Sequence, residues 1–344
     1  MPPRSFYADP SLSHYQSIID QFFPDISQEA SAFSADRGLP FINSISHLSA
    51  YMGIEASLIR QILHKREYHY RHFDLLKKDG TKRSISSPRT YLKVIQWWML
   101  DNVFQRVDLP ESVHGFRRGR SYISNAEIHL GSNHLLSVDL EAYFPSILTD
   151  RVSNVFQKIG YGIEISSTLS QLVTFKGALP QGSPCSPYIA NIVFYDADGE
   201  IKKICDENGY RYTRYADDIT ISSDQRIPKD FLATITKIIA VNGFSLNTNK
   251  TRFAGRGDRM EVTGLVINAV PSLPREWRYR AKAAFHQATR EPEAFMERLH
   301  ELQGLFGALL ATDPNERSAI TRKGRAALLA VRDQATKQRL SDSH

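Results

Sequence analysis

The sequence predicts a mixed α+β protein that ends in a helical module. Apolar residues recur at helical spacing near both ends of the chain, whereas the middle contains short alternating runs that are typical of strands. Of the 344 residues, 42% are hydrophobic and 23% are charged, which is the composition of an ordinary globular protein. This composition excludes a chain that is disordered throughout, and the length suggests about two domains or one elaborated core.

The first third of the chain is expected to be mostly helical, with one hairpin. Residues 1–65 contain an apolar stripe at helical spacing, made of Ile54, Leu58, Ile59, Ile62 and Leu63. Residues 68–88 alternate around Asp79-Gly80, which is a strong hairpin signal because glycine tolerates the positive φ of such turns. Residues 91–107 return to helical spacing and predict a further helix.

Three segments in the middle of the chain are predicted to form strands. Residues 134–139 are a buried run that ends in a carboxylate, and residues 211–223 alternate around an Asp-Asp pair and predict a second hairpin. Residues 262–268 are expected to form one more strand. Strand-like sequence then gives way to helical sequence at residues 271–274.

Two helices are expected after this boundary. The first carries an apolar stripe made of Phe295, Leu299, Leu302, Phe306 and Leu309. The second is expected to begin at Asp313, with Pro314 at its first position and Glu316 three residues after the aspartate, as in a capping box.

Basic residues are distributed unevenly along a chain of net charge +6. Residues 1–59 hold two basic and six acidic side chains, residues 60–120 hold fourteen and six, and residues 275–344 hold thirteen and nine. A groove between the two basic zones would attract a phosphate backbone, with an affinity that falls as salt rises. Solvated helix faces are the alternative interpretation of the same charges.

Sequence signals for export or membrane insertion are missing. No uninterrupted apolar run approaches the roughly 18 residues of a membrane span, and residues 1–20 lack the apolar core of a secretory signal. The two cysteines, Cys185 and Cys205, are too few for a zinc site or a disulfide scaffold. We therefore expect a cytoplasmic protein.

The pair Asp217-Asp218 is the most distinctive feature of the sequence. Neighbouring side chains of a strand point to opposite faces, so the two aspartates come together only where the backbone turns. The apolar flanks of Tyr215-Ala216-Asp217-Asp218 place the pair at a hairpin tip on a buried sheet. Repulsion and desolvation would be relieved there by a hard cation such as Mg²⁺. A solvent-exposed turn is the alternative, because Asp-Asp is common in turns.

A second candidate ligand, Asp139, ends the strand predicted at residues 134–139. A strand that ends in aspartate is common in metal sites and also as a helix cap. Together with Asp217, it would supply carboxylates from separate chain segments, as a two-metal phosphoryl-transfer site requires.

Three segments resemble successive core motifs of reverse transcriptases. They are Val-Asp-Leu-Glu-Ala-Tyr-Phe-Pro-Ser at 138–146, Leu-Pro-Gln-Gly-Ser-Pro-Cys-Ser-Pro at 179–187 and Tyr-Ala-Asp-Asp at 215–218. Within that family the chain is most similar to bacterial retron reverse transcriptases, because of Asn-Ala-Glu-Ile-His at 125–129 and Val-Thr-Gly at 262–264. The resemblance extends from about residue 60 to residue 310.

The resemblance implies a right-hand polymerase fold with fingers, a palm with an antiparallel sheet, and a helical thumb. An N-terminal helical extension would occupy residues 1–65. The fingers and palm would occupy residues 66–270, and the thumb with a C-terminal tail would occupy residues 271–344.

The resemblance also implies the catalytic groups. Asp139, Asp217 and Asp218 would bind two Mg²⁺ ions, for which Mn²⁺ could substitute, with the backbone carbonyl of Leu140 as a further ligand. Lys250 would protonate the leaving pyrophosphate. The alternative for Lys250 is a surface lysine beside a turn.

Further residues are implied to bind the incoming dNTP, namely Lys82, Arg83, Tyr143, Phe144, Gln181 and Gly182. The basic pair would hold the triphosphate, and Gly182 would allow close backbone approach. Phe144 would exclude a 2′-hydroxyl by a clash, with Tyr143 as the alternative if the loop is one residue shorter. The alternatives are that Phe144 is a core aromatic residue and that Lys82 and Arg83 belong to a hairpin whose charges are only solvated.

Template and RNA contacts complete the implied site. The fingers motif would contact the template through His114, Gly115, Phe116 and Arg117. The retron-like segments would bind the cognate RNA, or buttress the palm, through Asn125, His129, Val262, Thr263 and Gly264.

The implied function is RNA-directed DNA synthesis on part of a cognate structured noncoding RNA. Priming from a 2′-hydroxyl of that RNA would leave a branched RNA–DNA product, and such systems act with a separate effector protein in antiphage defence. One alternative is another prokaryotic reverse transcriptase, of the group II intron or abortive-infection type. A second alternative is a non-catalytic RNA-binding scaffold.

Overall fold

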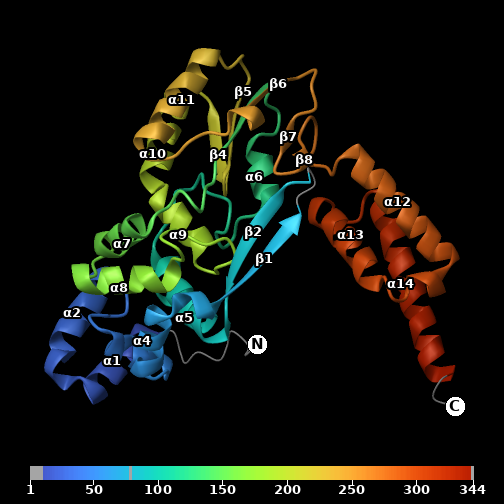
Figure 1. Ribbon diagram of the computed structural model, residues 1–344. Helices are drawn as coiled ribbons and strands as arrows, with labels where there is room; N and C mark the ends of the chain where they lie inside the picture. Colours follow the sequence, from blue (N-terminus) through green and yellow to red (C-terminus); the bar gives the residue numbers. More distant parts are fainter. Residues whose placement is uncertain (1–10, 77–79, 342–344) are drawn as a thin grey trace.

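The computed structural model describes residues 11–76 and 80–341, and it begins with four helices, as expected (Figure 1). These helices are α1 (Leu12–Phe22), α2 (Ser27–Arg37), α3 (Ile45–Met52) and α4 (Ala56–His64). The side chains of Ser11 and Ser44 accept hydrogen bonds from backbone amides in the first turns of α1 and α3, which explains where these helices start.

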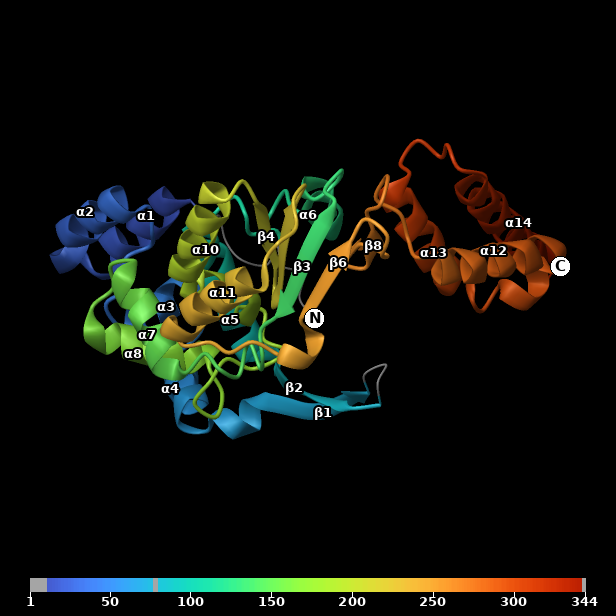
Figure 2. The ribbon, with the colours of Figure 1, turned by 90° about the horizontal axis from the view of Figure 1, so that it is seen from above.

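The expected hairpin follows and projects from the body of the molecule (Figure 2). Strands β1 (Tyr70–Leu76) and β2 (Lys82–Pro88) pair antiparallel along their whole length. The predicted Asp79 turn position lies outside the described residues. The helix expected at 91–107 is divided into α5 (Thr90–Asn102) and a short 3₁₀ turn, Phe104–Arg106.

The central sheet is antiparallel, with the strand order β4-β5-β3-β6. Its strands are β3 (His134–Asp139), β4 (Arg211–Tyr215), β5 (Asp218–Ser223) and β6 (Arg252–Gly255). The strand predicted at 134–139 and the hairpin predicted at 211–223 are thus confirmed. Figure 2 shows α10 (Tyr195–Glu207) and α11 (Lys229–Val241) along one face of this sheet.

The remaining helices of the body are packed around the sheet and the N-terminal helices. They are α6 (Tyr122–Ile128), α7 (Thr149–Lys158), α8 (Ile163–Val173) and α9 (Ser186–Val193). One continuous apolar core extends from Tyr15 to Phe244 and includes Trp98 and Phe156. The N-terminal helices therefore share their core with the sheet, which stabilises both by burial of the same apolar surface.

The segment predicted as one strand at 262–268 is instead a small hairpin. Strands β7 (Glu261–Val262) and β8 (Leu265–Val266) are joined by Thr263-Gly264. Both turn residues have a positive φ, 47° for Thr263 and 80° for Gly264. The single-strand prediction was wrong because this left-handed pair reverses the chain within two residues.

A helical bundle forms the C-terminal part, at one end of the molecule in Figure 1. It comprises α12 (Arg275–Arg290), α13 (Leu299–Thr312) and α14 (Ala319–Ser341). Its apolar core, which includes Phe285, Phe306 and Val331, is distinct from the core of the body. Within residues 11–76 and 80–341, every helix is too short or too polar to span a bilayer.

The last helix begins later than the sequence predicts. The carboxylate of Asp313 accepts hydrogen bonds from the backbone amides of Arg317 (2.8 Å) and Ser318 (2.9 Å), yet α14 starts only at Ala319. Glu316 has φ of 53°, which is incompatible with a right-handed helix. The predicted capping box is therefore absent, and the Glu316 carboxylate forms an ion pair with Arg325 instead.

Candidate active site

Three carboxylates meet at one end of the central sheet. Asp139 ends β3 and is paired in register with Asp218, the first residue of β5. Directly opposed residues of antiparallel strands have Cα atoms about 4.5–5.5 Å apart and side chains on the same face. The amide of Leu140 donates a hydrogen bond to the carbonyl of Asp217 (2.9 Å), which holds the third aspartate beside the other two.

The hairpin tip that carries Asp217 is a two-residue turn. Tyr215 pairs with Asp218, so Ala216 and Asp217 alone reverse the chain. Ala216 has φ of 58°, a left-handed conformation that is uncommon for residues other than glycine. Such strain persists only where surrounding contacts enforce it, and it is concentrated at functional sites.

The electrostatics of this cluster disfavour further negative charge. Burial raises the pKa of Asp218 to about 6, and the charges of Asp217 and Asp139 add to that effect. Burial also raises the pKa of Asp217, whereas the charges of Lys250 and Arg83 act in the opposite direction. A bound cation would therefore offset both the burial and the mutual repulsion of these carboxylates.

Lys250 is the cation already present beside these carboxylates. Its Nζ atom lies 2.8 Å and 2.9 Å from the two carboxylate oxygens of Asp139. This hydrogen bond raises the pKa of Lys250. Among the residues that the structure describes, no three metal-binding side chains are already arranged as a closed cluster.

A groove of about 1100 Å³ extends from the carboxylates toward the β1–β2 hairpin. Its walls come from the hairpin, from residues 139–145 and from the loop at 178–187. The sequence-predicted residues that line it are Lys82, Arg83, Phe116, Asp139, Leu140, Tyr143, Phe144, Gln181, Gly182, Asp217 and Lys250. Cations and carboxylates therefore face the same open space.

The loop at Gln181-Gly182 packs directly on the hairpin. The amide of Ser86 donates a hydrogen bond to the carbonyl of Gln181 (2.7 Å). Gly182 has φ of 119°, and a Cβ atom there would lie 2.9 Å from Ile85 Cγ2 and 3.0 Å from the carbonyl oxygen of Ser86. Only glycine fits this close approach.

The two neighbouring aromatic residues have different surroundings. Tyr143 is 3% exposed, and its hydroxyl donates a hydrogen bond to the carbonyl of Ala190 (3.0 Å). Phe144 is half-buried and lines the groove. The geometry favours Phe144 as the ring that faces a ligand.

The segment predicted to contact a template is mostly internal. His114 is 1% exposed, and its Nδ1 lies 2.9 Å from the hydroxyl of Ser124. The Gly115 backbone packs against the backbone of Tyr215 and Ala216, and Arg117 donates a hydrogen bond to the carbonyl of Pro110 (2.6 Å). Phe116, which is 49% exposed, reaches the groove.

The two retron-like segments lie against each other. Asn125 and His129 are buried, and the ring nitrogens of His129 lie 2.7 Å from the hydroxyls of Ser222 and Thr213. The His129 side chain thus links the end of α6 to β4 and β5.

The β7–β8 hairpin contacts α6 from the other side. The Thr263 hydroxyl donates a hydrogen bond to the carbonyl of Tyr122 (2.7 Å), and Val262 is buried in a small core with Ala126. Gly264, at the tip of the hairpin, is exposed. RNA contact by these segments remains a prediction.

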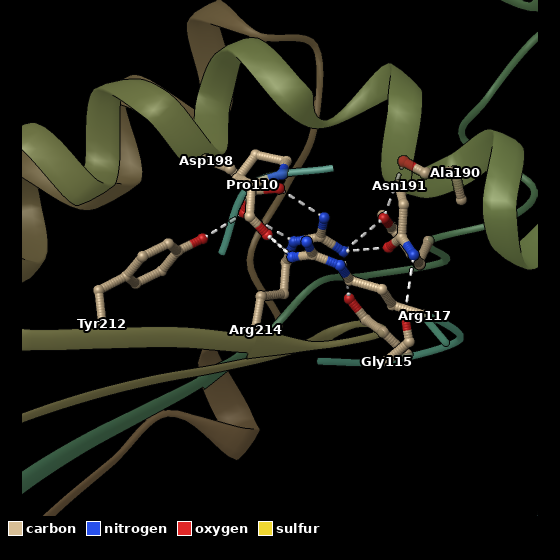
Figure 3. A network of polar contacts seen from close by, with 10 residues as sticks. Pro110, Gly115, Arg117, Ala190, Asn191, Asp198, Tyr212 and Arg214 are labelled. Carbon is tan, nitrogen blue, oxygen red and sulfur yellow. Dashed lines mark hydrogen bonds and ion pairs between the residues drawn. The ribbon is translucent and has the colours of Figure 1, made fainter. Parts of the chain in front are cut away.

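Sequence reasoning missed a buried polar network behind the Ala216-Asp217 turn (Figure 3). Its centre is the ion pair of Arg214 and Asp198, both side chains of which have no exposed surface. Asn191 and Tyr212 complete it. The available signal was Arg214 itself, a charged residue directly before the Tyr-Ala-Asp-Asp motif.

Comparisons with known proteins identify the family. Residues 75–267 match the family model described as reverse transcriptase (RNA-dependent DNA polymerase). The chain belongs to the reverse transcriptase family. This assignment implies the polymerase fold, and enzymes of the family generally use divalent metal ions.

Several retron enzymes are among the similar curated proteins. The chain is 34% identical over 317 residues to the retron Mx162 reverse transcriptase of Myxococcus xanthus, with 80% of this chain and 65% of that protein covered. It is 35% identical over 237 residues to the retron Ec86 reverse transcriptase of Escherichia coli, with 67% of this chain and 73% of that protein covered. The chain thus spans about two thirds of the Mx162 enzyme and belongs to the retron type.

Proposed function

We propose that this chain is a retron-type RNA-directed DNA polymerase that copies part of a cognate structured noncoding RNA into single-stranded DNA. The observation that supports this most strongly is the convergence of Asp139, Asp217 and Asp218 at the end of a groove that also contains basic side chains. Template RNA and dNTPs are the corresponding substrates.

The parts of the molecule would correspond to the palm, fingers and thumb of a right-hand polymerase fold. The central sheet with α10 and α11 would be the palm, the β1–β2 hairpin would belong to the fingers, and α12–α14 would be the thumb. The hydrogen bond from Ser86 to Gln181 joins fingers and palm at the nucleotide site.

The carboxylates fit a pair of magnesium ions. Their oxygen atoms are the ligands that hard divalent cations prefer, and their mutual repulsion and burial favour a bound cation. Asp139, Asp217 and the Leu140 carbonyl would hold the ions, with Asp218 contributing charge. Two bound Mg²⁺ ions would favour deprotonation of the attacking hydroxyl and neutralise charge on the phosphates.

The groove residues would bind and select the nucleotide. Lys82 and Arg83 would hold the triphosphate by charge-assisted hydrogen bonds, and Phe144 would exclude a 2′-hydroxyl sterically. Lys250 already lies at the carboxylates, so its raised pKa keeps it protonated near a leaving pyrophosphate. It would donate its proton there as a general acid.

The RNA substrate would also serve as primer. A 2′-hydroxyl of the cognate RNA would attack the first dNTP and leave a branched RNA–DNA product. The exposed tip of the β7–β8 hairpin at Gly264 is the part of the retron-like segments that is available to RNA. The biological role would be antiphage defence together with a separate effector protein.

Primer extension on an RNA template with Mg²⁺ tests this proposal. Asp217→Asn should reduce dNTP incorporation by about 100-fold or more, because one ionised ligand is lost. Asp224→Asn is the matched control, since Asp224 is exposed just beyond the other end of β5. A parent protein that incorporates no dNTP would contradict the proposal and favour an RNA-binding scaffold.

A further inference from the structure

The catalytic turn is contacted from behind by one buried guanidinium. Nη1 of Arg214 lies 3.0 Å from the carbonyl oxygen of Ala216, the left-handed residue of the turn. It also lies 2.9 Å from the Tyr143 hydroxyl and 2.9 Å from Asn191 Oδ1. Because Nη1 carries two hydrogens and faces three acceptors, at least one hydrogen is shared.

The other side of the same guanidinium is fixed by a bidentate ion pair. Nε and Nη2 of Arg214 lie 2.8 Å and 2.6 Å from the two carboxylate oxygens of Asp198. The Tyr212 hydroxyl donates a further hydrogen bond to Asp198 (2.5 Å). Figure 3 shows Asp198 and Asn191 projecting from the helices toward Arg214. The plane of the guanidinium is therefore fixed at both ends.

The backbone of Arg214 and the segment packed behind the turn are also held by hydrogen bonds and close contacts. Arg214 accepts a hydrogen bond from the amide of His114 and donates one to the carbonyl of Ser112, both at 2.9 Å. A Cβ atom on Gly115 would lie 2.4 Å from the amide nitrogen of Ala216. The carbonyl of Gly115 accepts a hydrogen bond from Asn191 (2.9 Å). Asn191 thus joins the segment behind the turn to the guanidinium.

Stability alone does not account for this arrangement. A buried ion pair contributes little net stability compared with apolar side chains that fill the same space. A guanidinium, however, offers donors in a rigid plane, so it can fix the relative positions of several acceptors at once. Its acceptors here are the catalytic turn and Tyr143, whose neighbour Phe144 lines the groove.

We infer that Arg214, held by Asp198 and Asn191, is a positioning residue that sets the geometry of the Ala216-Asp217 turn and thereby of the metal-binding carboxylates. This inference rests on the proposed function. It adds a residue that contacts neither substrate nor metal but determines where the ligand carboxylates lie. Small displacements of such groups strongly reduce rates.

The test compares Arg214→Lys with a matched substitution, Arg211→Lys. Lysine keeps the charge opposite Asp198 but cannot span the distance to Ala216 at the same time. Arg211 is on the same strand, is exposed, and binds the carbonyl of Leu130 (2.6 Å) rather than the turn. Folding of each variant is checked by circular dichroism and thermal unfolding.

Two readouts separate positioning from a merely structural role. For Arg214→Lys, kcat for dNTP incorporation should fall about tenfold to 100-fold while KM for dNTP stays within about twofold. Mn²⁺ affinity, measured by electron paramagnetic resonance without substrate, should fall at least about fivefold because the ligands no longer converge. Arg211→Lys should resemble the parent in kcat, KM and Mn²⁺ affinity.

A folded Arg214→Lys protein with parental kcat and Mn²⁺ affinity would overturn the inference, as would equal losses in Arg211→Lys. If Arg214→Lys does not fold, Asn191→Ala decides, because it removes two hydrogen bonds and leaves the buried ion pair of Arg214 with Asp198 intact. Asn191→Ala should lower kcat and Mn²⁺ affinity by smaller factors than Arg214→Lys, again with little change in KM for dNTP. Parental kcat and Mn²⁺ affinity in this variant would overturn the inference. An inactive parent would contradict the proposed function alone, since the Mn²⁺ comparison still tests the positioning role.

Discussion

At the scale of single residues, the active site concentrates negative charge where burial opposes it. The pKa of Asp218 is raised to about 6, and Lys250 lies within hydrogen-bond distance of Asp139. This arrangement lowers stability in exchange for a strong local preference for cations. Phe144 in the groove and His129 in the interior can be tested separately.

Phe144→Ala should relax discrimination against ribonucleotides. The ring lines the groove beside Asp139, and its removal would leave space for a 2′-hydroxyl. We expect kcat/KM for rNTPs to rise about tenfold or more relative to dNTPs, measured by single-nucleotide extension. Tyr143→Phe is the control for this ratio, because it keeps the ring and removes only the hydroxyl that contacts Ala190 and Arg214. An unchanged ratio in Phe144→Ala would show that another group excludes the hydroxyl.

His129 should make stability depend on pH below neutrality. Burial lowers the pKa of His129 to about 3, and the charges of Arg211 and His114 act in the same direction. Between that value and the unfolded pKa of about 6.5, the unfolded chain binds a proton that the folded chain does not. The stability is fully present above pH 6.5 and is lost as pH falls. The loss from pH 7 to pH 5 should be about 2 kcal/mol from this residue.

Urea unfolding of the parent and of His129→Gln at both pH values checks this expectation. The variant should lose less stability over the same interval, because glutamine does not titrate. The comparison is needed because Asp218, with its raised pKa, contributes in the opposite direction between pH 4 and 6. The same pH dependence in both proteins would mean that His129 is not the responsible group.

At the scale of elements, close packing between elements overrides the conformational preference of individual residues. The β1–β2 hairpin contacts the Gln181-Gly182 loop at a distance that only glycine allows, and α14 uses the same device in the C-terminal bundle. A Cβ atom on Gly324 would lie 2.8 Å from Phe306 and 3.0 Å from Phe285. Glycine is a poor helix former, so its place within α14 reflects the close approach of the helices.

Gly324→Ala should therefore destabilise the protein although alanine favours helices. We expect a loss of about 1–3 kcal/mol, because overpacking displaces the two phenylalanine rings. Gly307→Ala is the matched control in α13, where an added Cβ meets nothing within 4 Å. That variant should gain about 0.5–1 kcal/mol from helix propensity alone. Thermal unfolding of both variants measures the difference, and equal effects would contradict the packing explanation.

At the scale of the whole molecule, basic residues are distributed over two separately packed parts. The body and the C-terminal bundle have separate cores, and basic residues are concentrated at 60–120 and 275–344. An RNA–DNA hybrid bound across both parts would displace counterions from its phosphates. Association should thus be governed by salt more than by any single contact.

Affinity for an RNA–DNA hybrid should fall steeply with salt. If about four to six phosphates are neutralised, the dissociation constant should rise about 100-fold to 2,000-fold between 50 mM and 200 mM salt. Fluorescence anisotropy with a labelled hybrid measures it, and a neutral osmolyte at matched osmolarity is the control. A dissociation constant that is insensitive to salt would contradict binding through the two basic zones.

The sequence predicted the elements whose signals are local. Local signals marked the hairpin at 68–88, the strand at 134–139 and the hairpin at 211–223 that carries Asp217-Asp218 at its turn. The β7–β8 hairpin and the start of α14 were missed, because positive φ values at Thr263 and Glu316 are imposed by surrounding contacts. Local propensity cannot reveal a conformation that tertiary structure enforces.

The sequence by itself determined the family of this protein, because the motifs at 138–146, 179–187 and 215–218 are local runs of residues that can be recognised without the fold. Only the tertiary structure decided which side chains face the groove and which support it. His114 and Asn125 were candidates for ligand contact, yet they lie in the interior, whereas Arg214 has no motif to mark it and lies directly behind the turn. Burial and hydrogen-bond geometry depend on residues distant in the chain, and a linear pattern does not contain those distances.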